Sequence, residues 1–518
     1  MRNSGFLIAP ALLFSVFVAS AQDVREAYNF SNLTVQGTAS SMGYGNALGS
    51  LGGDFSSLSV NPAGLGVYRS SELSITPSLR MNGASSDYAG TTTMDNNTHF
   101  NINSFGLIFT NAARGKRYEH RNWKAVSFAF GMNRVADFNR NYTYQGNNST
   151  SSASQAFESD ANLNPGNSTS TTPNNSLGYF GFNSYLLNQN ATTGSFYTTV
   201  PFTGGINQLK SVQENGGIDE YVISLGGNYR EKLILGLTIG IPTINYRSNS
   251  SYTESSSDNN TITNPNGFSS FSYNQTLNIT GVGVNAKIGA IYKITDFFRI
   301  GAAFHSPTFY SITDVSKNSL YVNNDSSINA ANTVGYNGVY GRNSFDYNLT
   351  TPWKGILSAT FILKNLGFIT ADYEYVDYSS MRYQYGDGYQ ADQDAINQTI
   401  KKTYQGVSDF RIGAGFNITK FFILRVGAGY YGNAYTAYGE ANELNYTTQR
   451  IDLNGGIGFK FNKHFFADLG FVHSMYQGYE QPYSIDYGGV VSGTQATIPQ
   501  AKTNFSINNM ALSMGVRF

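Results

Sequence analysis

The segment IDLNGGIGFKFNKHFFADLGF (Ile451 to Phe471) decides which fold we expect for this chain. Large apolar residues recur at every second position on both sides of a turn at Asn462-Lys463, and Asp, Asn, Gly and Lys lie between them. A period of two indicates strands with one apolar face and one polar or small face. Such strands fit either a sandwich with a wet exterior or a membrane barrel with a wet interior. The alternation alone does not separate these two folds.

The connections between such segments do separate them. From about residue 70 onward the alternation recurs in fourteen segments, at 70–83, 98–112, 122–136, 218–229, 232–248, 271–294, 297–313, 343–363, 366–380, 403–417, 420–435, 446–461, 464–478 and 504–518. Every second connection is short, and the alternate ones are long and rich in Asn, Ser, Thr, Gly and Tyr, above all 137–217, 314–342, 381–402 and 479–503. This pattern predicts an all-β fold, a fourteen-stranded antiparallel transmembrane β-barrel with tight periplasmic turns and long extracellular loops.

Both ends of the chain carry export signals. Arg2 precedes an apolar run, 6–19, and an Ala-Ser-Ala site follows at 19–21. These features predict a signal peptide at 1–21. The last strand ends in Phe518, as in the C-terminal signal of outer-membrane proteins, and 37 Tyr and 36 Phe would supply interfacial girdles. We expect the outer membrane of a Gram-negative bacterium, with both mature termini periplasmic.

Several function classes find no support. A formal net charge of zero argues against a nucleic-acid partner, and a chain without Cys has no disulfides, zinc-thiolate site or cysteine nucleophile. The G-x-G-x-x-G match at 427–432 lies within a strand, with no helix after it, so it fails its structural context. His305 points inward and could serve a pore ligand or a haem, although a lone histidine is more often structural. We expect no enzyme activity, no metal site and no cofactor.

One strand phrase recurs as RIGAAF, RIGAGF and RVGAGY, beginning at Arg299, Arg411 and Arg425. Arginine facing lipid would cost about 2–4 kcal/mol, so the Arg and Gly positions are assigned to the lumen. The small residues beside each Arg leave room, as though something other than side chains fills the lumen. The arginines could belong to a pairing network across a polar lumen, or hold the carboxylate of a plug or a ligand.

The long connection 137–217 contains an apolar stretch, LGYFGFNSYLL (Leu177 to Leu187). Its large side chains either pack on neighbouring loops or form a hydrophobic landing site for a lipophilic ligand. The candidate capture residues are Leu177, Tyr179, Phe180, Phe182, Tyr185 and Leu186.

A segment of about forty-five residues, 22–66, precedes the first strand and contains GNALGSLGGDFSSLSVNPAGLG (Gly45 to Gly66). Its small-residue run, Asp54 and Asn61-Pro62-Ala63 with the following Gly64 resemble the N-terminal hatch of the FadL/TodX family. Members of that family are outer-membrane transporters for long-chain fatty acids and other hydrophobic compounds. The resemblance implies a hatch at 22–66 inside a barrel formed by 67–518, with Asp54, Asn61, Pro62, Ala63 and Gly64 at the gate.

The resemblance also implies a mechanism of passive uptake. A fatty acid-like or other lipophilic molecule would be captured by the loops, reach a pocket above the hatch and leave sideways at a kink in the third strand, for which Gly131 is the candidate. Expected partners are this ligand and outer-membrane lipid, with a monomeric protein. A general porin and a surface adhesin built on a barrel are the alternatives, but a porin would need no hatch.

Overall fold

The structure is a computed structural model that describes residues 24–164, 177–256, 264, 267–324, 336–442, 447–485 and 497–518. The predicted signal peptide at 1–21 lies outside the described residues.

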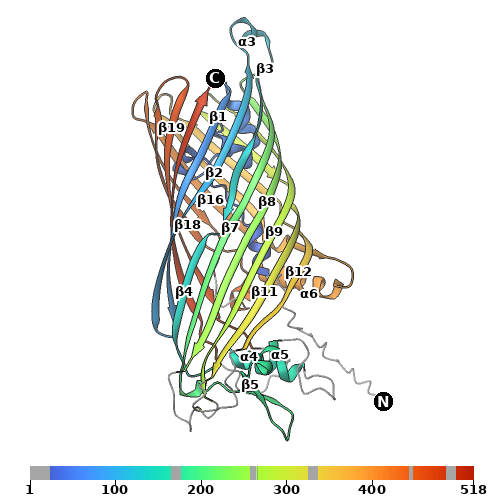
Figure 1. Ribbon diagram of the computed structural model, residues 1–518. Coiled ribbons are helices and arrows are strands. Elements are labelled where there is room, and N and C mark those ends of the chain that lie inside the picture. The colour runs from blue at the N-terminus through green and yellow to red at the C-terminus, as the bar shows by residue number, and fades with distance from the viewer. Residues whose placement is uncertain are drawn as a thin grey trace, which may run out of the picture.

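Antiparallel strands form a closed barrel with fourteen positions around its wall (Figure 1). Closure occurs between β1 and β20, where Glu72 pairs with Arg517. Ten positions hold one strand each: β1 (Glu72–Tyr88), β2 (Thr91–Ala112), β7 (Ile206–Tyr229), β8 (Leu233–Ser255), β9 (Phe268–Lys293), β16 (Gly406–Asn417), β17 (Phe422–Tyr431), β18 (Arg450–Lys460), β19 (Phe465–Glu480) and β20 (Ala501–Arg517). Four positions hold two consecutive strands: β3 (Trp123–Asp137) with β4 (Arg140–Asn148), β10 (Phe298–His305) with β11 (Phe309–Asn324), β13 (Lys354–Ile362) with β12 (Tyr336–Thr350), and β14 (Gly367–Asp377) with β15 (Arg382–Tyr385). The predicted fold class and strand number are confirmed.

The outer face of this wall is apolar, as the alternation predicted. Ile300, Ile412 and Val426 of the three repeated phrases are 42%, 55% and 46% exposed, whereas the preceding Arg411 and Arg425 are buried. Exposed aliphatic and aromatic side chains on every wall position form a continuous band suited to lipid. Among the described residues, no helix combines the length and apolar character needed to cross a membrane.

The short turns and Phe518 lie together at one end, here called the turn end, and the long connections lie at the loop end (Figure 1). The strands are longer at the loop end than predicted: β7, β8 and β9 have 24, 23 and 26 residues. About 9–11 residues suffice to span a membrane, so these strands continue far beyond it. The predicted loops at 137–217 and 314–342 are therefore too wide, and 84–97 is a tight hairpin that turns between Tyr88 and Thr91.

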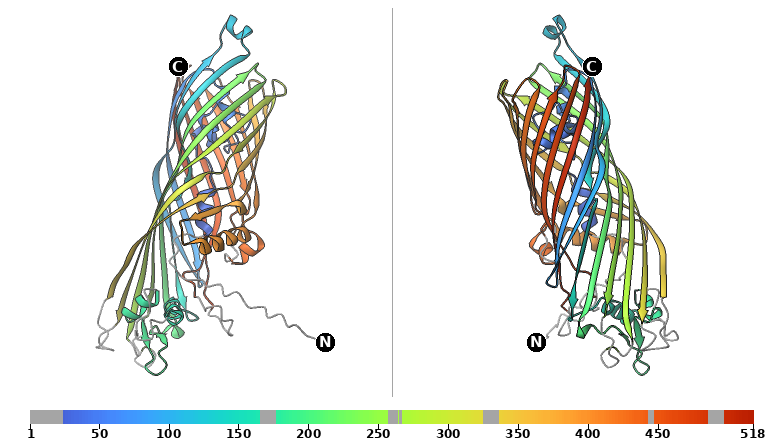
Figure 2. Two further views of the ribbon diagram at one scale, coloured as in Figure 1. Left: turned by 90° about the vertical axis from the view of Figure 1, so that its right-hand side faces the viewer. Right: turned by 60° about the vertical axis from the view of Figure 1, so that its left-hand side comes forward.

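Smaller elements complete the molecule (Figure 2). At the loop end lie α4 (Ser154–Leu163), α5 (Leu177–Asn183), β5 (Leu187–Gln189), β6 (Phe196–Thr198), the 3-10 turn η3 (Phe202–Gly204), α6 (Gln390–Thr403) and α7 (Ala437–Asn442). The 3-10 turn η4 (Tyr378–Ser380) separates β14 from β15, and α3 (Lys116–His120) stands at the turn end. Before β1, the chain forms α1 (Val24–Ser31), α2 (Ala39–Gly43), η1 (Phe55–Ser59) and η2 (Pro62–Val67).

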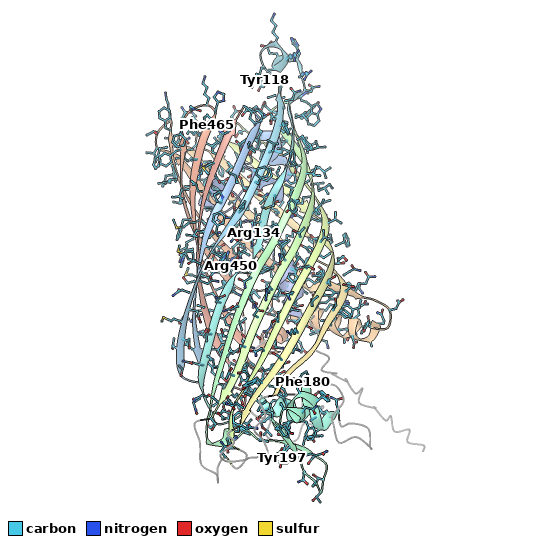
Figure 3. The ribbon with its side chains drawn as sticks, in the orientation of Figure 1. Tyr118, Arg134, Phe180, Tyr197, Arg450 and Phe465 are labelled. Carbon is cyan, nitrogen blue, oxygen red and sulfur yellow. The ribbon has the colours of Figure 1, made fainter. Side chains whose placement is uncertain are left out.

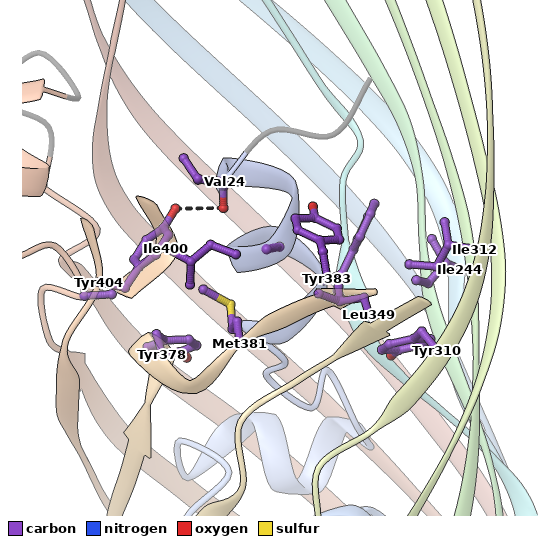
Figure 4. Close-up of a cluster of buried hydrophobic side chains, with 14 of the residues drawn as sticks. Val24, Ile244, Tyr310, Ile312, Leu349, Tyr378, Met381, Tyr383, Ile400 and Tyr404 are labelled. Atoms are coloured by element: carbon purple, nitrogen blue, oxygen red, sulfur yellow. Dashed lines mark hydrogen bonds between the residues drawn. The ribbon is translucent and has the colours of Figure 1, made fainter. Parts of the chain in front are cut away.

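The N-terminal helix lies deep in the barrel on the side of the loop end. Val24 accepts a hydrogen bond of 3.1 Å from the Tyr404 hydroxyl, next to buried Ile400 and Met381 (Figure 4). Phe518 lies at the turn end, bonded to Ser71 through its backbone. The first described residue thus lies in the lumen and the last one at the turn end, and the periplasmic position of both mature termini stays a prediction.

The outward phase of the wall makes a direct prediction. Ile412→Arg places a charge in the apolar band. For the protein folded into lipid vesicles, we expect this change to lower the free energy of unfolding by about 2–4 kcal/mol. Asn504→Arg, on the exposed face of β20 nearer the loop end, should change it little. Urea titration of protein folded into lipid vesicles measures both, and equal effects would contradict the assigned band.

Candidate functional site: the segment inside the barrel

Residues 24–68 fill the lumen as a compact irregular segment, here called the hatch. It touches the wall on all sides: α2 contacts β17 to β20, η1 contacts β2, β7 and β8, and η2 contacts β3, β7, β8 and β9. Hydrogen bonds from Arg299 in β10 and to Asp372 in β14 add the remaining side of the wall, so the hatch lies inside the barrel (Figures 1 and 2). Burial raises the pKa of the Tyr44 phenol well above its ordinary value, so this hatch side chain stays neutral.

The Asn61-Pro62-Ala63 corner is fixed by a single amide side chain. The fully buried Asn61 accepts from Ala63 N at 3.0 Å, which caps η2, and Pro62 follows as its first residue. Its Nδ2 donates to the carbonyl of Gly49 at 2.5 Å and lies 3.3 Å from the carbonyl of Ala290 in the wall. One residue thus ties two parts of the hatch to each other and to β9.

Asp54 is used within the hatch and not by the wall arginines. Its carboxylate accepts from the Thr38 hydroxyl at 2.7 Å and from Ser56 N at 2.9 Å, which caps η1. Gly64 supports the same turn, because it donates to Asn61 O at 2.9 Å and accepts from Gly53 N at 3.0 Å. Of the two alternatives for the lumenal arginines, holding a plug carboxylate therefore does not describe the contacts of Asp54.

The three lumenal arginines have different partners. Arg299 donates to the hatch carbonyl of Leu51 at 3.0 Å. Arg411 lies 2.9 Å from Glu374, and Arg425 lies 2.7 Å from Asp468. Two of the three therefore belong to a pairing network in the wall, and one binds the hatch backbone directly.

Other wall side chains also bind hatch backbone groups, and sequence reasoning did not find most of them. Asp372 accepts from Gly49 N at 3.0 Å, and Ser513 accepts from Ala39 N at 2.8 Å. His305, expected to point inward, lies with Nε2 2.8 Å from the carbonyl of Val60. Its inward position thus serves a hatch contact. The described residues contain no group of His, Asp and Glu arranged to hold a metal ion.

The glycines of the repeated phrases allow the backbone of the hatch to approach the wall closely. A Cβ at Gly301 would lie 2.3 Å from Gly49 O, and one at Gly413 would lie 2.1 Å from Tyr44 O. At Gly427 it would lie 2.5 Å from the carbonyl carbon of Tyr44. No side chain fits in these spaces, so the small residues beside each Arg do leave room for a backbone that fills the lumen.

Gly131 has the same kind of role. It pairs in register with Gly106 and Val222, and a Cβ there would lie 2.5 Å from the ring of Phe55 in the hatch. The irregularity in the third strand lies farther along, between Arg134 and Ala136. The kink at Gly131 stays a prediction.

Beyond this irregularity the third strand leaves its neighbour. β2 pairs with β3 only over Ser104–Ala112, whereas 134–148 pairs only with β7. Among the described strands, no backbone ladder joins 91–103 to 134–148, and we call this gap in the wall the seam. The hatch takes up the freed edge, because Thr34 N and Gln36 N donate to Val135 O and Arg134 O, each at 2.8 Å (Figure 3 labels Arg134).

Polar side chains close the seam. Asp137 lies at its centre, where its carboxylate accepts from Asn101 Nδ2 at 2.6 Å and lies 3.3 Å from His99 Nε2. Farther out, Thr143 N donates to the Asp95 carboxylate at 2.6 Å, and Asn97 donates to Asn141 at 3.3 Å. The start of the seam lies beside the apolar band, since Phe100 and Ile102 are 67% and 40% exposed.

Besides a small cavity of about 50 Å³ beside Val60 and His305, two larger cavities border the hatch. One, of about 170 Å³, lies between the hatch and the wall and reaches Asp137 at the seam. The other, of about 230 Å³, lies nearer the loop end and is lined by Tyr142, Tyr246 and Phe505 among others. Tyr28, Asn29 and Arg140 border both cavities, so the two spaces adjoin.

The apolar residues of the long connection are mostly packed together. Phe180 and Leu186 are buried with Phe157 and Phe196, and Leu177 and Phe182 are partly buried against them. This cluster lies at the far loop end, around the labelled Phe180 (Figure 3). Tyr179 is half-buried, and only Tyr185, at 41% exposure, is open. The sequence left packing and a landing site as alternatives, and packing accounts for this cluster.

No family model matches the sequence, and no curated protein matches it. Solved structures do. A crystal structure of a Pseudomonas aeruginosa FadL homologue is 12% identical, covers 94% of this chain and 100% of its own, and has a TM-score of 0.55. The Pseudomonas putida toluene transporter TodX is 13% identical, covers 94% and 100%, and has a TM-score of 0.51. At these identities the likeness concerns the fold. The chain therefore has the fold of the FadL and TodX channels, a fourteen-stranded barrel built around its own N-terminal segment.

Proposed function

We propose that this protein is an outer-membrane channel for the passive uptake of long-chain fatty acids or other hydrophobic small molecules, and that the hatch is its gate. The observation that carries the proposal is a lumen filled by the protein's own N-terminal segment beside a seam in the wall. The shared fold with a FadL homologue and a toluene transporter supports it.

The way the hatch is held suits a gate. Its wall contacts are hydrogen bonds such as those from Gly49 N to Asp372 and from Arg299 to Leu51 O. Water can replace such bonds, so each is worth only about 1.5–3 kcal/mol net, the range for hydrogen bonds to charged groups. A ligand in the adjoining cavities can therefore shift the hatch without breaking the strand ladders of the wall.

The seam offers an exit to the lipid. Thr34 and Gln36 of the hatch hold the third strand by its backbone, so movement of the hatch also moves the strand beside the seam. Separation of Asp137 from Asn101 and His99 would open a sideways path near Phe100 and Ile102. No ATP or ion gradient is needed for such a path.

Deletion of 22–66 tests the gate. Removing the hatch should empty the lumen, so we expect vesicles containing the variant to become leaky to small polar solutes, measured by osmotic swelling. If the protein were a surface adhesin, the deletion should not make the vesicles leaky. Swelling unchanged from the full-length protein would contradict a plugging role.

A substitution at one glycine tests whether close packing of the hatch against the wall keeps the pore closed. Gly427→Ala places a methyl group against Tyr44, and overpacking of this kind costs about 1–3 kcal/mol, so the hatch should shift and solute leak should rise. Gly455→Ala is the matched control, since nothing lies within 4 Å of its Cβ position. If both variants leak equally, the contact at Tyr44 does not hold the gate.

The seam is tested by closing it. The natural chain has no Cys, so Asn97→Cys with Asn141→Cys gives one pair across the seam. A disulfide or a short bis-thiol linker should slow uptake of a fatty acid by vesicles, and reduction of the disulfide should restore it. Each single variant serves as control. Undiminished uptake by the cross-linked protein would exclude this exit.

A further inference from the structure

The connection between β2 and β3 differs in charge from the other short turns. Its sequence, ARGKRYEHRNWK (Ala113 to Lys124), has five Arg or Lys residues and a single acid, Glu119. All its side chains from Arg114 to Trp123 are exposed. It projects beyond the neighbouring turns, with Tyr118 near its tip (Figures 1 and 3). The whole chain has 33 basic and 33 acidic residues, so this excess is local.

The neighbouring turn extends the same positive region. Arg230 donates to Asn122 through its backbone at 2.7 Å and through Nε at 2.9 Å, which joins the two turns. The acid of that turn, Glu231, is already paired with Arg69 at 2.7 Å and Lys293 at 3.1 Å. It therefore does not offset Arg230 and Lys232. We call residues 113–124 and 230–232 the basic knob.

The basic knob is held together by contacts of its own and has aromatic residues at its base. Ala113 N donates to Lys124 O at 2.9 Å, and the Lys124 ammonium lies 4.4 Å from the centre of the Tyr118 ring. At its base, Trp123 is 46% exposed and packs edge-on against Tyr229 with ring centres 5.5 Å apart. Exposed Trp and Tyr mark the membrane–water interface. The cations therefore begin at the level of the lipid headgroups.

We propose that the basic knob binds the anionic headgroups of phospholipids in the leaflet at the turn end. Clusters of Lys and Arg next to a membrane-spanning wall attract anionic lipid, and the arginine fork matches a phosphate. The interfacial aromatics at the base favour lipid over an acidic protein as the partner. The proposal rests on the membrane location in the proposed function but not on transport. Anionic lipid would then collect on one side of the barrel, at the turn end of the strands β2 and β3 that border the seam.

The chain supplies its own reporter. It has two Trp residues, and Trp353 lies between β12 and β13, so Trp353→Phe leaves Trp123 alone at the base of the basic knob. This variant is placed in phosphatidylcholine bilayers that contain brominated phosphatidylglycerol or brominated phosphatidylcholine. We expect the anionic lipid to quench Trp123 with a relative binding constant about fivefold higher or more, as expected for even one basic residue near the surface. High salt should reduce this preference by screening.

Two triple variants in the Trp353→Phe background separate the basic knob from charge in general. Lys116→Gln, Arg117→Gln and Arg121→Gln together should lower the preference by about fivefold or more, although Arg114, Lys124, Arg230 and Lys232 remain. Lys364→Gln, Lys420→Gln and Lys463→Gln together remove the same charge from other turns and should keep it. Equal quenching by both lipids, or a preference unaffected by the first triple change, would overturn the proposal. Solute transport is not measured, so failure here leaves the proposed channel function untouched.

Discussion

An enclosed backbone that belongs to no sheet must still have hydrogen-bond partners for its N–H and C=O groups, and this constraint shapes the whole barrel. The hatch is such a backbone, and the wall supplies what it lacks. Asp372 and Ser513 accept from its N–H groups, Arg299 donates to one carbonyl, and His305 binds another. The lumenal face is polar because it completes the hydrogen bonds of another part of the chain.

The same constraint explains why polar and glycine residues alternate around the wall. A wall side chain can bind the hatch only where neighbouring positions let the backbone approach, as Gly301 does beside Arg299. The third strand shows the reciprocal case. It loses its partner β2 beyond Asn133, and the hatch pairs with it at Arg134 and Val135. The hatch and the third strand thus satisfy each other's backbone hydrogen bonds, which links the position of the hatch to the shape of the wall.

Features set by local sequence could be predicted, and features set by distant contacts could not. The strand count was correct because a period of two and a tight turn, as at Asn462-Lys463, are visible within twenty residues. The loop-end extensions of β7 and β8 were missed because they are rich in polar residues such as Ser, Asn and Gln and lack the alternation. The space that Gly131 leaves for Phe55 is invisible in sequence, since the two residues are far apart in the chain. A plug carboxylate was one of two alternatives for the lumenal arginines, whereas the local sequence offers Asp54 as the N-cap of the turn that begins at Phe55, where its carboxylate accepts from Ser56 N.

The course of the hatch also restricts how the molecule can be assembled. Val24 lies towards the loop end, beside Tyr404, while β1 begins with Glu72 at the turn end, next to the last residues of β20. The hatch therefore runs along the lumen in the direction opposite to β1. The leading end of the chain has to travel most of the length of the pore before it reaches its final contacts. Pairing of β1 with β20 closes the barrel, so the hatch enters the lumen before that step or through the opening at the turn end after it.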